Sequence, residues 1–170
     1  MNLVSSQTNS LNGEVVCPGD KSISQRILIL GSLLNCNTSI KGFLDAYDPN
    51  STLNALNLIG SSIVKTRTSI ILNKRTQPFK MPEKDLDLGN SGTGMRLMLG
   101  LLSGLDIRAT LTGDSSLSKR PMLRVIKPLM EMGANIKSND GNAPIRIIES
   151  NISNDYKYDM PIASAQVKSS

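Results

Sequence analysis

The stretch PGDKSISQR, residues 18–26, joins two apolar runs through a polar corner. The run before it predicts a β-strand at residues 14–17, which Pro18 and Gly19 end. The run after it predicts an α-helix over residues 22–34 that is apolar almost all round, so we expect this helix to be buried on most faces. The stretch is therefore a strand-to-helix corner.

Two cations and several short polar side chains stand at this corner. Asp20, Ser22 and Ser24 are candidate N-caps of the helix. Ser22 and Arg26 are four residues apart and share one helix face, with Lys21 beside them. A helix N-terminus that carries a hydroxyl, an ammonium and a guanidinium is suited to a phosphate or a carboxylate. A capped surface helix with solvated cations would explain the same residues equally well.

Composition limits the class of protein. The 170 residues suit one ordinary domain or two small ones, and 39% hydrophobic with 19% charged residues is typical of a globular chain. Aromatic residues make up only 3%, which argues against a base-stacking surface, so we expect no nucleic-acid partner. The net charge of +5 fits an anionic partner without identifying it.

The sequence argues against a metal site, a disulfide and a membrane-spanning segment. There is no histidine, and the two cysteines, Cys17 and Cys36, lie in or beside apolar segments. We therefore expect a reduced, cytoplasmic protein with no metal, no cofactor and no His-based triad. The longest apolar run, residues 27–34, is too short to span a bilayer, so no membrane partner is expected.

The order strand, helix, strand, helix, strand, strand occurs twice, and the repeat shows in the sequence. Gly19 and Arg26 align with Gly89 and Arg96 at a constant spacing of 70 residues. A third corner begins near residue 160. We therefore predict an α/β (α+β) fold of repeated βαβαββ units, divided into an N-terminal segment (1–14), a first unit (15–80), a second unit (81–152) and the truncated start of a third (153–170). The expected elements after the first corner are strands at 38–44, 62–67, 69–73, 85–88, 107–112, 134–137 and 145–149, and helices at 48–59, 95–102 and 121–132.

The later corners also offer anion-binding groups. In GNSGTG, residues 89–94, glycines leave room for a ligand near backbone N–H groups, although the spacing fits neither a Walker A loop nor a Rossmann motif. Arg120 stands directly before a predicted helix and could grip a phosphate or carboxylate. Glycines that only cap a helix and an arginine that is only a surface charge remain open alternatives. Ser164 and Gln166 are candidate binding residues only because they lie at the third corner. No pair of residues in the sequence is recognisable as a general acid and base.

Four motifs, GDKSISQR, LGNSGTGMR, TGDSSLSKRPM and SAQVKSS, occur in this order. From about Asn12 the chain thereby resembles the 5-enolpyruvylshikimate-3-phosphate synthase (3-phosphoshikimate 1-carboxyvinyltransferase) family. The resemblance implies an inside-out α/β barrel, incomplete here, with residues 1–14 associated with the other domain. It implies transfer of the enolpyruvyl group from phosphoenolpyruvate to the 5-hydroxyl of shikimate 3-phosphate, with release of phosphate, in chorismate and aromatic amino acid biosynthesis. It also implies inhibition by glyphosate, no cofactor, and a monomer at full length.

The resemblance assigns roles to residues that match the family motifs. Those implied to contact shikimate 3-phosphate are Lys21, Ser22, Arg26, Ser164 and Gln166. Those implied to contact phosphoenolpyruvate are Lys21, Gly92, Arg120 and Gln166. Glyphosate competes at the position of Gly92, and because an alanine there is associated with tolerance, Gly92 predicts sensitivity.

Two departures from the family pattern limit these expectations. Gln25 stands where the motif commonly has His, and we expect little effect because its side chain points away from Arg26. The family's acid/base residues lie beyond the SAQVKS motif, so no catalytic residue and no turnover are expected here. Alternatives are a UDP-N-acetylglucosamine enolpyruvyl transferase, whose reactive loop Cys is not matched by Cys17 or Cys36, and a non-catalytic phosphate- or RNA-binding module of the same fold.

Overall fold

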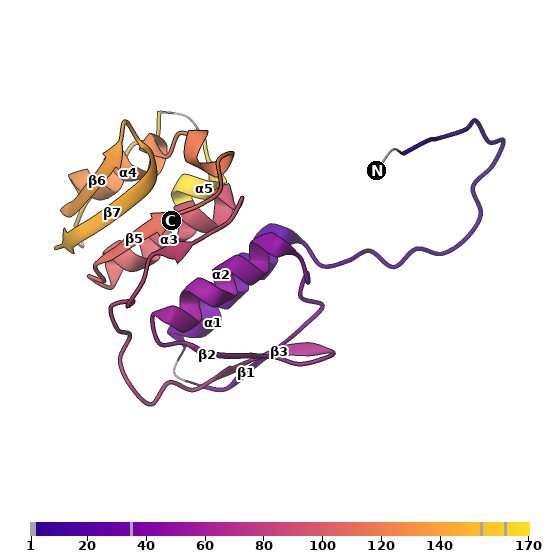
Figure 1. The fold of residues 1–170 in the computed structure, drawn as a ribbon, viewed down its shortest axis with the longest axis horizontal. Coiled ribbons are helices and arrows are strands. Elements are labelled where there is room, and N and C mark those ends of the chain that lie inside the picture. The colour runs from indigo at the N-terminus through magenta and orange to yellow at the C-terminus, as the bar shows by residue number, and fades with distance from the viewer. Residues whose placement is uncertain (1–2, 35, 154, 162) are drawn as a thin grey trace.

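The computed structural model describes residues 3–34, 36–153, 155–161 and 163–170. From α1 to β7 the helices and strands follow the predicted order (Figure 1). They are α1 (Lys21–Leu33), β1 (Thr38–Lys41), α2 (Tyr47–Leu58), β2 (Ser62–Lys65), β3 (Ser69–Asn73), β4 (Leu86–Asp87), α3 (Gly92–Gly104), β5 (Ala109–Thr112), the 3-10 helix η1 (Leu117–Lys119), α4 (Leu123–Glu131), β6 (Ala134–Asn139), β7 (Asn142–Ser150) and α5 (Ala165–Lys168).

Two sheets repeat one topology. In the first, β3 lies between β1 and β2 and is antiparallel to both. In the second, β7 lies between β5 and β6 in the same way, and β4 adds a parallel strand beside β5. The two halves therefore share the order that the aligned glycines and arginines predicted.

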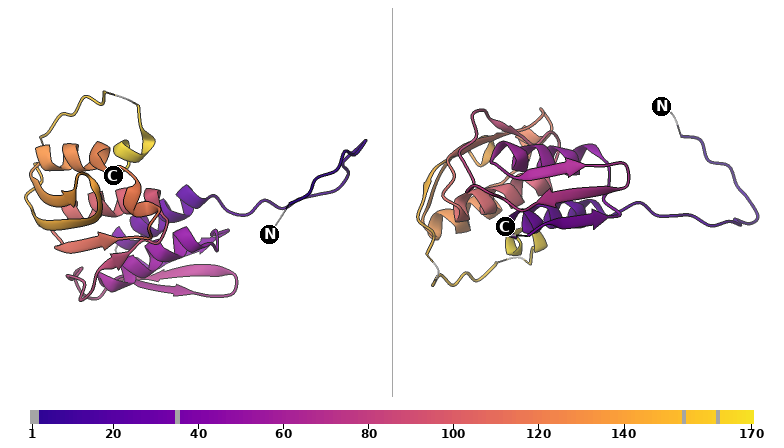
Figure 2. Two further views of the ribbon diagram at one scale, coloured as in Figure 1. Left: turned by 45° about the horizontal axis from the view of Figure 1, so that its top comes forward. Right: turned by 90° about the horizontal axis from the view of Figure 1, so that it is seen from below.

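Helix α3 lies at the centre of the structure. Met95, Met98, Leu99 and Leu102 on α3 are all fully buried, and α3 contacts α1 and α2 of the first half as well as α4 and β7 of the second. A helix that is apolar all round must be covered on all sides. Figure 2 shows α1 and α2 packed against the β1–β3 sheet, while α3 joins the two halves.

The predicted strand at residues 14–17 is wrong. Residues 3–20 form no helix or strand and run away from the body of the molecule (Figure 1). Val15 and Val16 are almost fully exposed, and β1 pairs with β3 on one side only among the described strands. Because this apolar run has no neighbouring strand to donate to and no core to enter, its β-propensity alone does not order it.

One further expectation needs correction. Helix α1 begins and ends within one residue of its prediction, but only one side is covered: Ile23 and Leu30 are 65% and 61% exposed. Cys17 and Cys36, which lie in or beside apolar runs of the sequence, are both exposed free thiols.

The hairpins were predicted correctly. β2 pairs with β3, and β6 pairs with β7 around Asp140 and Gly141, which adopt φ angles of 50° and 82°. Such left-handed pairs close tight hairpins, which explains the Asn-Asp-Gly sequence there. Among the described helices, none is long and apolar enough to cross a membrane.

Candidate anion-binding site

The first corner is held by its own cap. The Asp20 carboxylate accepts a hydrogen bond from the Ile23 N–H at 2.7 Å, so α1 begins at Lys21. Arg26 then folds back over the first turn, where its Nη1 donates to the Ser22 carbonyl at 3.3 Å. Ser22 itself is half-buried beside it. The predicted one-turn spacing of these two residues is therefore present.

Lys21 faces α2 across this corner. Its Nζ lies 3.0 Å from Asp48 Oδ2, and half of the lysine side chain is exposed. An exposed ion pair of this kind contributes only about 0–1 kcal/mol. An incoming anion can therefore compete for the ammonium at little cost.

The second corner is the N-terminus of α3. Ser91 caps it by accepting a hydrogen bond from the Gly94 N–H at 3.0 Å. A Cβ placed on Gly92 would lie 3.2 Å from Nη1 of Arg120 and 3.3 Å from Nη1 of Arg96. Two guanidinium groups therefore converge on a backbone position that has no side chain. This arrangement suits an anion that approaches the helix end.

Arg96 is a buried cation with neutral partners. Its Nη1 donates to Gln166 Oε1 at 2.8 Å and to the Gly92 carbonyl at 3.3 Å, and its Nη2 donates to the Pro121 carbonyl at 3.2 Å. Burial lowers the pKa of Arg96, and the positive charges of Arg124 and Arg120 lower it further. Its Nε is buried without a hydrogen-bond partner, and none of the described ion pairs includes it. The guanidinium still stays charged, so the pocket carries uncompensated positive charge.

Arg120 is oriented by a relay of polar groups. Its guanidinium donates to Asn90 Oδ1, and Asn90 Nδ2 donates to Asp114 Oδ2 at 2.7 Å. Hydrogen bonds from the Leu117 N–H and from Asn90 lower the pKa of Asp114, so this group is held as a carboxylate. Asn90 and Asp114 were not predicted as site residues, although both lie inside the motifs that carry Gly92 and Arg120.

The third corner is brought to the other two. Ser164 caps α5 by accepting a hydrogen bond from the Val167 N–H at 3.4 Å. Gln166 donates to Thr93 Oγ1 at 3.1 Å and accepts from Arg96, which ties this corner to the second. Arg26 Nη2 donates to Ser169 Oγ at 2.9 Å, which ties it to the first.

Gln25 completes the set by joining the first corner to the second. Its Nε2 lies 2.6 Å from Ser91 Oγ and 3.0 Å from Thr52 Oγ1, and the residue is fully buried. The side chain was predicted to point away from Arg26 with little effect, and its contacts with Ser91 and Thr52 were not predicted. The signal was present: Gln25, Leu28 and Ile29 fall at the i, i+3 and i+4 positions of the buried face of α1.

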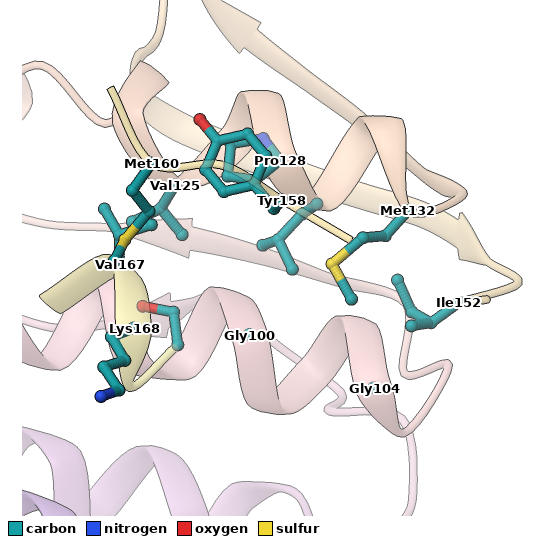
Figure 3. Close-up of a pocket in the computed structure, with 12 residues that line it drawn as sticks. Gly100, Gly104, Val125, Pro128, Met132, Ile152, Tyr158, Met160, Val167 and Lys168 are labelled. Carbon is teal, nitrogen blue, oxygen red and sulfur yellow. The ribbon is translucent and has the colours of Figure 1, made fainter. Parts of the chain in front are cut away.

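An apolar cavity of about 400 Å³ lies beside the third corner. Figure 3 shows it between α3, which contributes Gly100 and Gly104, and the segment with Tyr158 and Met160. Its lining is almost entirely apolar, with Lys168 at its edge. The cavity therefore lacks the convergent charges found at Gly92 and is no second anion site. In the part of the chain that the structure describes, no cluster of three or more acidic, Cys or His side chains is placed to hold a metal ion.

Comparison with known proteins gives a consistent result. The family model described as EPSP synthase (3-phosphoshikimate 1-carboxyvinyltransferase) matches residues 5–170. The 3-phosphoshikimate 1-carboxyvinyltransferase of Ruthia magnifica is 48% identical over 163 residues, which cover 95% of this chain and 38% of that protein. The enzyme of the same name from Legionella pneumophila (strain Lens) is 45% identical over 172 residues, which cover 99% of this chain and 40% of that protein.

The solved structures agree with the sequence comparisons. An EPSP synthase structure from Acinetobacter baumannii superposes with a TM-score of 0.83 at 40% identity, over 92% of this chain and 36% of that one. The chain thus spans roughly two fifths of the length of the curated relatives it matches. The match over nearly the whole chain, in both sequence and fold, shows that it belongs to the EPSP synthase (3-phosphoshikimate 1-carboxyvinyltransferase) family.

Proposed function

We propose that this chain binds shikimate 3-phosphate and phosphoenolpyruvate as part of an enzyme that transfers the enolpyruvyl group from the second to the 5-hydroxyl of the first. Phosphate is released, and the product leads to chorismate and the aromatic amino acids. The curated relatives carry the name of this activity. The observation that carries the proposal is the meeting of Arg96 and Arg120 at Gly92, beside two further corners.

The first and third corners hold shikimate 3-phosphate in this proposal. Arg26, already aimed from α1 toward Ser169 of the third corner, takes the carboxylate. Ser22 and Lys21 stand at the same helix end, while Ser164 and Gln166, at the start of α5, hold the phosphate. A phosphate and a carboxylate both suit this mixture of hydroxyl, amide and cationic donors.

The second corner holds phosphoenolpyruvate. Arg120 grips it, Lys21 and Gln166 reach it from the neighbouring corners, and Gly92 leaves the space that it fills. The uncompensated charge of Arg96 strengthens the attraction for a small, multiply charged anion. Glyphosate, an anion of similar size, competes there. We also propose that the full-length enzyme is a cytoplasmic monomer without a cofactor.

The chain supplies binding groups rather than acid and base catalysts. Among the described carboxyls with a shifted pKa, Asp45 and Asp114 are both shifted downward, Asp45 chiefly by its hydrogen bond from Lys65 and Asp114 by that from the Leu117 N–H. A general acid near neutral pH requires the opposite shift. Asp45 and Asp114 are therefore held as carboxylates, and neither is proposed as the general acid of the reaction.

Isothermal titration calorimetry with shikimate 3-phosphate tests this function. We expect measurable binding, and we expect Arg26→Ala to weaken it about 10- to 100-fold, because charged hydrogen bonds contribute about 1.5–3 kcal/mol each. Arg67→Ala is the matched control, since Arg67 is exposed in the β2–β3 turn. A folded chain that ignores shikimate 3-phosphate but binds RNA would overturn the proposal in favour of an RNA-binding module.

A further inference from the structure

Gln25 lies where α1, α2 and α3 meet and is fully buried. Its Nε2 is surrounded by three acceptors: Ser91 Oγ at 2.6 Å, Thr52 Oγ1 at 3.0 Å and the Asp48 carbonyl at 3.3 Å. A glutamine amide has only two N–H groups, so these acceptors compete for them and hold the side chain in one place. Burial makes the loss of such a donor costly for the acceptors that remain.

Two of the three partners of Gln25, Ser91 and Asp48, lie next to a proposed ligand group. Ser91 caps α3 and directly precedes Gly92. Asp48 holds Lys21 through its carboxylate while its carbonyl contacts Gln25. Gln25 itself directly precedes Arg26 on α1. The amide therefore spans the distance between the corner proposed for shikimate 3-phosphate and the corner proposed for phosphoenolpyruvate.

Gly94 makes room for this contact. A Cβ on Gly94 would lie 2.8 Å from both Ser91 Oγ and Thr52 Oγ1 and 2.9 Å from Gln25 Nε2. Real Cβ atoms do not approach other atoms this closely, so an alanine would push the amide or α3 aside. Gln25 and Gly94 are thus matched in volume, with the long side chain on α1 facing the missing one on α3.

We propose that Gln25 is a positioning residue that fixes the N-terminus of α3, and with it Gly92 and Arg96, relative to Lys21 and Arg26 on the first corner. It touches neither substrate and acts through Ser91 and Asp48. The inference rests on the proposed function for the identity of the ligands. The contact itself, and its dependence on Gly94, rest on the geometry alone.

Calorimetric titration of Gln25→Met with shikimate 3-phosphate and with phosphoenolpyruvate tests the positioning role. Methionine keeps the length of the side chain but removes both N–H donors, so we expect both affinities to fall about tenfold while the chain stays folded by circular dichroism. Ser32→Ala is the matched control: Ser32 is also buried on α1, donates to the Leu28 carbonyl at 2.7 Å and contacts no corner. We expect its affinities to stay within about twofold of wild type. Unchanged binding by Gln25→Met would overturn the proposal.

A volume exchange tests the pairing with Gly94. We expect Gly94→Ala to lower the affinities for both ligands about tenfold or more. Adding Gln25→Asn to this variant should recover part of the lost affinity, because the shorter amide side chain withdraws from the new methyl group. If the fold-losses in affinity of the two single variants multiply in the double variant, with no recovery of affinity, Gln25 and Gly94 are not coupled.

Amide NMR spectra recorded without ligand separate this inference from the proposed function. The Gly94 N–H donates to Ser91 Oγ, so its resonance should shift in Gln25→Met and stay in place in Ser32→Ala. If the wild type does not bind shikimate 3-phosphate, the proposed function fails, while this shift still supports the contact. A Gly94 resonance that is unmoved in Gln25→Met would refute the contact itself.

Discussion

Gly92 has no side chain at the point where Arg96 and Arg120 converge, and we propose that this position leaves the space for an anion. An added Cβ would lie 3.2 Å from one guanidinium and 3.3 Å from the other. Both contacts are to the ends of flexible side chains, so the fold can absorb the methyl group. The anion then loses the room that it needs.

We therefore expect Gly92→Ala to lower the affinities for phosphoenolpyruvate and glyphosate about tenfold by calorimetry. The affinity for shikimate 3-phosphate should stay within about twofold of wild type. Gly104→Ala is a matched control on the same helix, because a Cβ there meets nothing within 4 Å. If the affinities for phosphoenolpyruvate, glyphosate and shikimate 3-phosphate all fell equally, the substitution would have disturbed α3 as a whole instead of removing local space.

At the scale of elements, the loop before α4 depends on one carboxylate. Asp114 Oδ1 accepts hydrogen bonds from the Leu117 N–H at 2.7 Å and the Ser116 N–H at 3.0 Å at the start of η1. Its other oxygen holds Asn90, which in turn holds Arg120. The same carboxylate therefore orders the loop and orients the arginine.

The lowered pKa of Asp114 predicts how this element responds to acid. A group whose pKa is lower in the folded protein stabilises it above its ordinary pKa, here 3.8, and loses that contribution as the pH falls through the lowered value. We expect Asp114→Ala to be less stable than wild type by a constant amount between pH 5 and 7, and the difference to shrink below about pH 4, in urea unfolding followed by circular dichroism. The exposed Asp159→Ala serves as control. A difference that is independent of pH down to pH 2 would contradict the role of the charge.

The elements also show how far sequence reasoning reached. Periodicity located α1, the strands of the two hairpins and the helix at residues 95–102, because in these segments local pattern and tertiary packing agree. It failed at residues 14–17, where a strand needs a partner that no local pattern supplies. It also failed on the exposed side of α1, because an apolar residue on a helix does not reveal whether another element covers it.

The site residues divide in the same way into those that local sequence pattern predicts and those that depend on contacts between distant segments. Gly92, Arg96, Arg120 and Gln166 were brought together as the repeated corners suggested. Ser91 and Ser164 cap the helices that carry Gly92, Arg96 and Gln166, while Arg120 directly precedes Pro121 before α4. The roles of the named residues toward particular ligands stay predictions. Gln25, Asn90 and Asp114 were missed because their importance comes from contacts between distant segments, which a linear pattern does not show.

For the whole molecule, we expect binding without turnover. The described residues place cations and amides around the proposed ligands, and the two carboxyls whose pKa is shifted, Asp45 and Asp114, are both shifted downward. A phosphate-release assay with both substrates should therefore stay at background for this chain, with the Legionella pneumophila relative as positive control. Robust phosphate release would show that one of its carboxyls acts as the missing acid or base.

The three corners are joined pairwise: Gln25 links the first to the second, Arg96 and Gln166 link the second to the third, and Arg26 links the third to the first. Because the three links form a closed loop, each corner stays connected to the other two, directly or through the third corner, when any one link is lost. Substitution of one linking residue should therefore weaken ligand binding while the other two links remain. Substitution of two linking residues should loosen one corner from both others and weaken binding by more than the two single effects multiplied together.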